Sequence, residues 1–367
     1  MSEPMRVPFN MLRLGADERA DVDAAIARVI DSGWFVLGPE VTAFEAEFAT
    51  AMQARHAVGV NTGTDAIALV LRALGIGPGD EVITSPLSAA YSALAIDMAG
   101  ARPVFADIDP DRLTLDPAAA EGAVTSRTRA ILPVHLYGQP ADLDAIRAVA
   151  NRHGLAIVED ACQAHLATCH GTPVGRGSSA AAFSFYPTKN LGALGDGGAI
   201  TTDDAALADR LRRLRNGGQV SRYHHDERGV NSRLDELQAA VLRARLPRLA
   251  TATATRRRLA GAYRDALRGT TVVQVPREHD AGHVYHLFPV LVAERDRFQA
   301  HMRAAGIETL IHYPVPIPRQ PAAAAWSPAT CSVADRVTAE VVSLPLYPSL
   351  APAALAEVTA AVAAFPR

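Results

Sequence analysis

The sequence of 367 residues contains a single lysine, Lys189, among its 36 lysine and arginine residues. A guanidinium group stays protonated in proteins, whereas a desolvated ε-amine can lose its proton and form a Schiff base with a carbonyl compound. The scarcity of lysine therefore restricts covalent side-chain amine chemistry to one position. Lys189 either carries such chemistry or is a chance survivor of a composition biased toward arginine.

Cysteine is also scarce, with residues only at Cys162, Cys169 and Cys331. Their odd number argues against a disulfide framework, and their spacing matches no metal site. We expect buried and unreactive thiols, with a redox pair of Cys162 and Cys169 as the alternative.

Long apolar segments are missing as well. No run approaches the roughly 18 residues of a membrane span, and the N-terminus lacks the apolar core of a signal peptide. We therefore expect a cytoplasmic protein without a membrane partner. The net charge of -3 shows no excess of basic residues that would indicate nucleic-acid binding. Arginine clusters at residues 212–215 and 256–258 are predicted to lie on solvated helix faces.

From about residue 17 to 218, short apolar strands alternate with helical segments. The predicted strands cover residues 81–84, 103–106, 130–134, 156–158, 180–183 and 199–202. This alternation is typical of a mostly parallel sheet with helices on both faces. Ligands of such folds bind beyond the carboxyl ends of the strands, where this chain places polar residues.

The pattern changes in the C-terminal part of the chain. A long helical stretch at residues 234–267 is interrupted at Pro247 and has the character of a connector between domains. A smaller α/β unit follows, with a strand at residues 286–292. We predict a large domain over residues 1–248, and a connecting helix with a small C-terminal domain over residues 249–367.

Gly63 and Thr64 stand at the start of a predicted helix. Backbone N–H groups at a helix N-terminus bind anions, glycine allows close approach, and a threonine hydroxyl adds a donor. A simple N-cap is the alternative role of Thr64.

Two further polar residues end apolar strands. Asp160 follows one of them, and Ser184 follows another, five residues before Lys189. A carboxylate in such a position either contacts a ligand or caps a turn. The run Gly192–Gly198 comes after the lysine, so it is not a phosphate-binding P-loop, in which the lysine follows the glycines.

One cofactor, pyridoxal 5′-phosphate (PLP), accounts for all of these residues. PLP needs a lysine for its aldehyde, an acidic partner for its ring nitrogen and donors for its phosphate. Lys189 suits the first role and, once released, could move the proton during transamination. Asp160 suits the second role, and Thr64, Ser184 and the helix N-terminus suit the third.

A series of motifs surrounds these residues, in order between about residues 8 and 348. The motifs are Asn61-Thr62-Gly63-Thr64-Asp65-Ala66, Val134-His135-Leu136-Tyr137-Gly138, Glu159–His165, Ser184–Gly192, Gly195–Gly198, Gly229–Glu236, Tyr285-His286 and His312-Tyr313-Pro314. The series resembles the DegT/StrS-type sugar aminotransferases, which are fold-type I PLP enzymes. The resemblance implies an α/β fold with a large domain, whose mostly parallel mixed sheet is flanked by helices, and a smaller C-terminal α/β domain.

The resemblance also assigns cofactor contacts. Lys189 would bond the aldehyde and Asp160 would pair with the pyridinium nitrogen. Gln163 would contact the phenolic oxygen or the ring edge. Gly63, Thr64 and Ser184 would bind the phosphate.

Other implied roles concern the neighbouring subunit and the substrate. Asn231 would reach the phosphate of the cofactor in a second copy of the chain, which implies a homodimer with shared active sites. Tyr186, His312 and Tyr313 would border the substrate pocket. No metal is expected.

The chain departs from the family pattern at three positions. Ala89 stands where the family has an aromatic residue stacked on PLP, so either Tyr91 supplies that ring or the cofactor face is covered differently. Gly217 and Tyr347 stand where the family often has histidine, and we expect them to tune substrate binding. Lys189 itself argues against the branch that has histidine at this position and catalyses dehydration.

We therefore expect an aminotransferase that moves an amino group from glutamate or glutamine to a keto-sugar, in particular a nucleotide-linked one, in amino-sugar biosynthesis. A keto-cyclitol or another cyclic ketone is an alternative acceptor. The non-enzymatic alternative is a sensor that keeps the PLP fold but does not catalyse a reaction.

Overall fold

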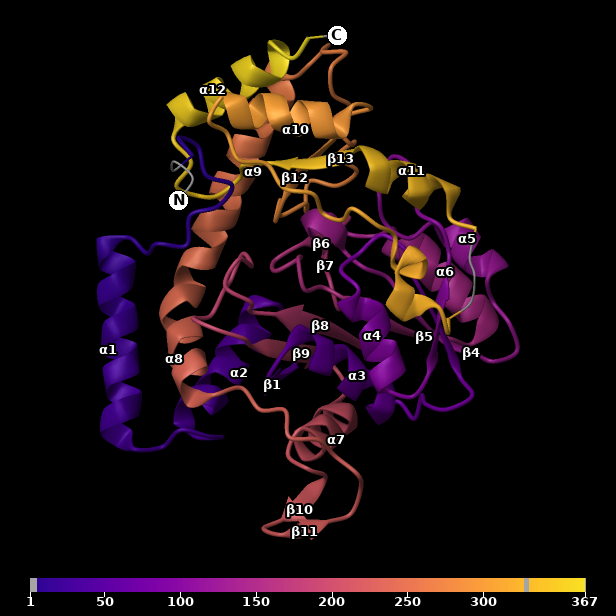
Figure 1. Ribbon diagram of the computed structural model, residues 1–367. Coiled ribbons are helices and arrows are strands. Elements are labelled where there is room, and N and C mark those ends of the chain that lie inside the picture. The colour runs from indigo at the N-terminus through magenta and orange to yellow at the C-terminus, as the bar shows by residue number, and fades with distance from the viewer. Residues whose placement is uncertain (1–4, 327–329, 367) are drawn as a thin grey trace.

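A seven-stranded sheet forms the centre of the computed structural model, which describes residues 5–326 and 330–366 (Figure 1). Its strands, in spatial order, are β1 (His56–Val60), β9 (Gly198–Thr202), β8 (Ala180–Ser184), β5 (Ala156–Asp160), β4 (Thr128–Leu132), β2 (Glu81–Thr84) and β3 (Arg102–Phe105). β9 runs antiparallel to both of its neighbours, and the remaining pairs are parallel. The predicted mostly parallel mixed sheet is confirmed.

Helices flank this sheet and build the C-terminal part of the chain. They are α1 (Ala16–Ser32), α2 (Pro39–Ala51), α3 (Gly63–Ala73), α4 (Tyr91–Met98), α5 (Pro117–Gly122), α6 (Leu143–His153), α7 (Ala205–Leu214), α8 (Glu236–Arg245), α9 (Leu249–Ala266), α10 (Arg295–Ala304), α11 (Ser332–Glu340) and α12 (Pro352–Ala363). Within the described ranges, none of the helices combines the length and the apolar character that crossing a membrane requires.

Alternate strand residues pack on opposite faces of the sheet, because side chains of a strand point alternately up and down. In β8, Ala180 and Ala182 join the core beneath α3 and α7. Ala181 and Phe183 join the opposite core, which α2 and α8 cover. Burial on both faces explains why this strand reads as a continuous apolar run.

The C-terminal unit has its own apolar core around a two-stranded sheet, at the top of Figure 1. β12 (Phe288–Leu291) pairs antiparallel with β13 (Val341–Leu344), and α9, α10 and α12 pack around them. The strand expected at residues 286–292 is present but shorter. The helical stretch expected at residues 234–267 is divided into α8 and α9 by a 3₁₀ turn at Leu246–Arg248, which contains the predicted interruption at Pro247.

The prediction of solvated arginine clusters is wrong at two positions. Arg215 and Arg256 are only 7% and 5% exposed. Arg215 donates to the Gly59 carbonyl at 2.6 Å and pairs with Glu45. Arg256 donates to the Leu346 carbonyl at 2.9 Å. Backbone carbonyls thus compensate the cost of burying each guanidinium, which a helical pattern alone does not reveal.

His165 is fully buried beneath the sheet and contacts the rings of Phe48, Phe183 and Phe185. Within the described part of the chain, neither ring nitrogen has a hydrogen-bond partner. Burial lowers the pKa of His165 from 6.5 to about 3, and the charge of Lys189 adds to this effect. The folded chain therefore holds a neutral imidazole.

This burial predicts a specific acid sensitivity. As the pH falls from 6.5 toward 3, the unfolded chain takes up a proton at His165 that the folded chain does not, so stability falls. We expect His165→Phe to lose free energy of unfolding less steeply than the wild type over this range, as measured by urea unfolding at a series of pH values. The exposed variant His153→Gln is the control. A wild-type slope in His165→Phe would contradict the assignment.

Candidate active site

Lys189 lies in the segment that follows β8, at the carboxyl edge of the sheet. Its backbone N–H donates to the Tyr186 carbonyl at 2.8 Å. Burial lowers the pKa of its ammonium group, while the interactions with Cys162 and Asp160 act in the opposite direction. The lysine is thus easier to deprotonate than an exposed one, as attack on a carbonyl carbon requires.

A cavity of about 430 Å³ opens beside Lys189. The N-terminal segment 10–15 forms one side of it, and Arg245 and Arg248 line another. Each of these arginines is paired, Arg245 with Glu18 at 2.7 Å and Arg248 with Asp21. The only lysine of the chain therefore borders a space large enough for a small-molecule ligand, although Gly63, Asp160 and Ser184 do not line this cavity.

Asp160 ends β5, which pairs in parallel with β8, and is 6% exposed. Its Oδ1 accepts the backbone N–H of Cys162 at 3.1 Å, which is the turn-capping role considered from the sequence. Its Oδ2 accepts the hydroxyl of Ser92 at 2.6 Å. The carboxylate also acts on the pKa of Lys189 and of Tyr313, so it belongs to the same site as both.

The N-terminus of α3, at Gly63, has donor groups suited to an anion. Thr62 is the N-cap of α3, because its Oγ1 accepts the backbone N–H of Asp65 at 3.0 Å. The capping role that was the alternative for Thr64 therefore belongs to Thr62. Among the described residues, the hydroxyl of Thr64 makes no hydrogen bond, which leaves it free for a ligand.

Two glycines bring this helix start against the end of β8. A Cβ atom at Gly63 would lie 2.6 Å from Cys162 Sγ and 2.9 Å from Ser184 Cβ. A Cβ atom at Gly198 would lie 2.4 Å from the Thr62 carbonyl. Only glycine allows this approach, which places the N–H groups of the helix start beside Ser184. The resulting set of donors fits a phosphate group.

Gln163 connects the sheet edge to the C-terminal part of the chain. Its Oε1 accepts the backbone N–H of Tyr137 at 2.7 Å, and its Nε2 donates to the Tyr313 hydroxyl at 3.3 Å. The Tyr137 hydroxyl in turn donates to the His312 carbonyl. Two of the predicted substrate residues are thereby held over the same edge as Lys189.

His312 and Tyr313 are both neutral near pH 7. Burial and the charge of Lys189 lower the pKa of His312 to about 4. Burial raises the pKa of Tyr313 to about 12, against the hydrogen bond from Gln163. At this position the two residues offer hydrogen bonds and ring surface to a substrate and carry no charge.

Three predicted site residues stand apart from this cluster. Tyr91 and Tyr186 are 64% and 52% exposed. Asn231 is exposed and pairs with Asn216, beside the hairpin of β10 (Gln219–Ser221) and β11 (His224–His225) that projects at the bottom of Figure 1.

Sequence reasoning gave no role to several residues that shape the site. Ser92, which binds Asp160, lies on α4 and is distant from Asp160 in the sequence. Asn190 donates to the Val284 carbonyl at 3.1 Å and contacts His286 at 3.3 Å, which ties the residue after Lys189 to the C-terminal part. His286 belongs to the Tyr285-His286 motif, and this motif is the only feature of the sequence that indicates it.

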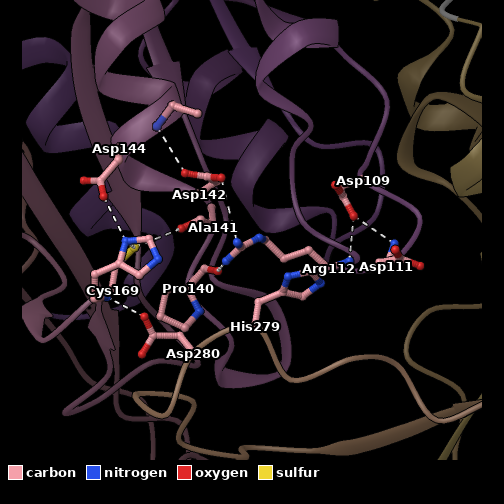
Figure 2. Close-up of polar contacts among 12 residues, drawn as sticks. Asp109, Asp111, Arg112, Pro140, Ala141, Asp142, Asp144, Cys169, His279 and Asp280 are labelled. Carbon is pink, nitrogen blue, oxygen red and sulfur yellow. Dashed lines mark hydrogen bonds and ion pairs between the residues drawn. The ribbon is translucent and has the colours of Figure 1, made fainter.

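A second polar cluster lies on the hairpin of β6 (Thr168–Cys169) and β7 (Thr172–Pro173), shown in Figure 2. Ligand atoms of Cys169, His170 and Asp280 lie within 4.8 Å of one another. Their polar groups already have protein partners: His170 Nδ1 pairs with Asp144 at 2.8 Å, and Asp280 accepts the N–H groups of His170 and Gly282. We assign these contacts to packing of the hairpin and place no metal there.

Comparison with known proteins shows the family of the chain. The family model described as the DegT/DnrJ/EryC1/StrS aminotransferase family matches residues 16–363. A dTDP-3-amino-3,4,6-trideoxy-alpha-D-glucose transaminase of Streptomyces venezuelae is 52% identical, over 95% of this chain and 93% of the relative. A UDP-N-acetyl-3-dehydro-alpha-D-glucosamine 3-aminotransferase of Acidithiobacillus ferrooxidans is 44% identical, over 95% of each chain.

Solved structures agree with the sequence relatives. S. venezuelae DesV, in complex with a ketimine intermediate, superposes with a TM-score of 0.95 at 51% identity, covering 98% of each chain. NtdA from Bacillus subtilis, with bound cofactor PMP, has a TM-score of 0.91 at 32% identity, covering 98% of this chain and 85% of its own. These likenesses confirm the predicted fold class, and the chain belongs to the DegT/DnrJ/EryC1/StrS aminotransferase family.

Proposed function

We propose that this aminotransferase uses PLP to move an amino group from glutamate or glutamine to C3 of a nucleotide-linked keto-sugar. The observation that carries the cofactor assignment is the convergence of the only lysine, the buried Asp160 and the helix start at Gly63 on one edge of the sheet. The activities named for the relatives from S. venezuelae and A. ferrooxidans support the acceptor, since both concern an amino group on C3 of a nucleotide-linked sugar.

Each of the site residues has a separate role in the proposed reaction. PLP, when bound, supplies an electron sink for the carbon that loses a proton. Asp160 would pair with the ring nitrogen and favour its protonated form. Lys189 would bind the aldehyde, and its free Nζ would serve as the proton carrier, for which its lowered pKa is suitable. Thr64, Ser184 and the N–H groups of the helix start would hold the phosphate.

The proposal includes a homodimer with shared active sites, and it keeps the cytoplasmic location expected from the sequence. Trp34, Phe35 and Val36 form a run between α1 and α2 and are 57%, 49% and 41% exposed. An exposed run of large apolar residues is typical of an interaction surface. Asn231 and the projecting hairpin suit contact with a second copy, because Asn231 is exposed in a single chain.

Lys189→Ala should abolish the visible absorbance band that the wild type acquires with PLP and retains through gel filtration. No other side chain supplies an amine, so the loss should be complete. The double variant Lys189→Ala/Arg213→Lys is the control, since it restores a lysine at a partly exposed position on α7. A band retained in Lys189→Ala would contradict the cofactor assignment. A band restored by Arg213→Lys would show that a lysine elsewhere in the chain can replace Lys189.

A substrate panel tests the acceptor. We expect dTDP-linked and UDP-linked 3-keto-hexoses to be aminated at least about 10-fold faster than 4-keto-hexoses or keto-cyclitols, with glutamate or glutamine as donor and mass spectrometry of the product. Faster amination of a keto-cyclitol would contradict the proposed acceptor and favour the keto-cyclitol in its place. A protein that binds PLP but forms no pyridoxamine phosphate with any amino donor would be a sensor.

Hybrid dimers test whether Asn231 acts across the subunit boundary. Lys189→Ala and Asn231→Ala homodimers should both have low activity. If Asn231 serves the neighbouring site, a hybrid of the two variants contains one site with both wild-type residues. When the two variant homodimers are mixed after partial denaturation, each hybrid dimer that forms should therefore have about half of the wild-type activity. No restoration, with hybrids demonstrated by native mass spectrometry, would place Asn231 in its own subunit's site.

A further inference from the structure

The carboxylate of Asp160 has a partner on the far side of a neighbouring strand. Ser92 Oγ lies 2.6 Å from Asp160 Oδ2. Asp160 comes from β5 and Ser92 from α4, which follows β2, and β4 lies between these two strands. The hydrogen bond therefore spans the carboxyl end of β4. Such a bond fixes the carboxylate relative to the sheet, which the backbone of β5 alone cannot do.

A second serine extends this contact. Ser88 Oγ lies 3.2 Å from Ser92 Oγ, and either hydroxyl could donate. An ionised carboxylate only accepts hydrogen bonds, so Ser92 must donate its single proton to Asp160. Ser88 is then the donor to Ser92, and the chain of bonds has one direction, from Ser88 through Ser92 to Asp160.

All three side chains are withdrawn from water. Ser88, Ser92 and Asp160 are 4%, 1% and 6% exposed. In a medium of low dielectric constant each hydrogen bond polarises the next, and a charged acceptor strengthens the bond that it receives. The Cys162 N–H holds Oδ1 at 3.1 Å, and the Ser92 hydroxyl holds Oδ2. With both oxygens held, rotation of the carboxylate about its Cβ–Cγ bond is blocked.

We propose that Ser92, supported by Ser88, is a positioning residue that orients the Asp160 carboxylate toward the ring nitrogen of the cofactor. This inference rests on the proposed function, because it concerns how tightly the chain holds PLP and how firmly the ring nitrogen stays protonated. Neither serine touches the reacting atoms. Lys189, Cys162 and Tyr313 are the titratable groups that interact with Asp160, and none of them is a hydrogen-bond partner of Ser92 among the described residues.

Two readouts that do not depend on turnover follow from this role. Ser92→Ala should weaken PLP binding to the apoprotein by about 10-fold, the usual scale for one hydrogen bond to a charged group. It should also move the pH midpoint of the visible absorbance change of the bound cofactor upward by about half a unit. A less firmly protonated ring removes a positive charge near the Lys189 linkage, so that linkage keeps its own proton to higher pH.

A double-mutant cycle separates positioning from general damage to the fold. In the Asp160→Asn background, Ser92→Ala should change PLP affinity by less than about 2-fold, because the carboxylate through which it acts is gone. Ser88→Ala should have a smaller effect than Ser92→Ala, and no effect once Ser92 is alanine. Ser92→Thr, which keeps the hydroxyl, should restore most of the affinity.

Ser85→Ala is the matched control. Ser85 is a serine of equal burial in the segment between β2 and α4, but its hydroxyl donates to the Leu87 carbonyl and, among the described residues, makes no hydrogen bond to Asp160. It should leave the pH midpoint unchanged. A wild type that fails to bind PLP would overturn the proposed function itself. A wild type that binds PLP, with Ser92→Ala equal to it in affinity and midpoint or equally harmful in both backgrounds, would overturn only the role of Ser92.

Discussion

The close packing of the α3 N-terminus against the end of β8 is the constraint on which the site depends. Gly63 has no room for a Cβ atom between Cys162 and Ser184, and Gly198 has none beside Thr62. This contact places the donors of a helix start next to the strand that leads to Lys189. A larger residue at either position would separate the anion-binding donors from the lysine, whatever else remained folded.

A second consequence concerns charge. The parallel register of β5 and β8 puts Asp160 at the same edge as Ser184, in surroundings from which water is largely excluded. Burial lowers the pKa of Lys189, while Asp160 and Cys162 limit the effect. His312, Tyr313 and His165 are neutral nearby, so Asp160 and Lys189 are the two groups of opposite charge whose interaction a bound ligand would alter.

Much of this arrangement could be predicted from the sequence, and the failures have physical reasons. The ends of the strands at Asp160 and Ser184 can be predicted from the sequence, because each is marked by an apolar run that stops at a polar residue. The N-cap is Thr62, two residues before Thr64, because it is the Thr62 hydroxyl that reaches the Asp65 N–H. The burial of Arg256 and the bond from Ser92 to Asp160 join elements distant in the sequence, and only the folded topology brings them together.

The central claim is that the single lysine carries the cofactor. Incubation with PLP, reduction with borohydride and peptide mapping by mass spectrometry test it most directly, since the reduced linkage is stable and the chain offers one side-chain amine. The account predicts a phosphopyridoxyl group on the peptide that contains Lys189, at close to one per chain, and none when PLP is omitted. Modification confined to the N-terminus, or no modification, would contradict it.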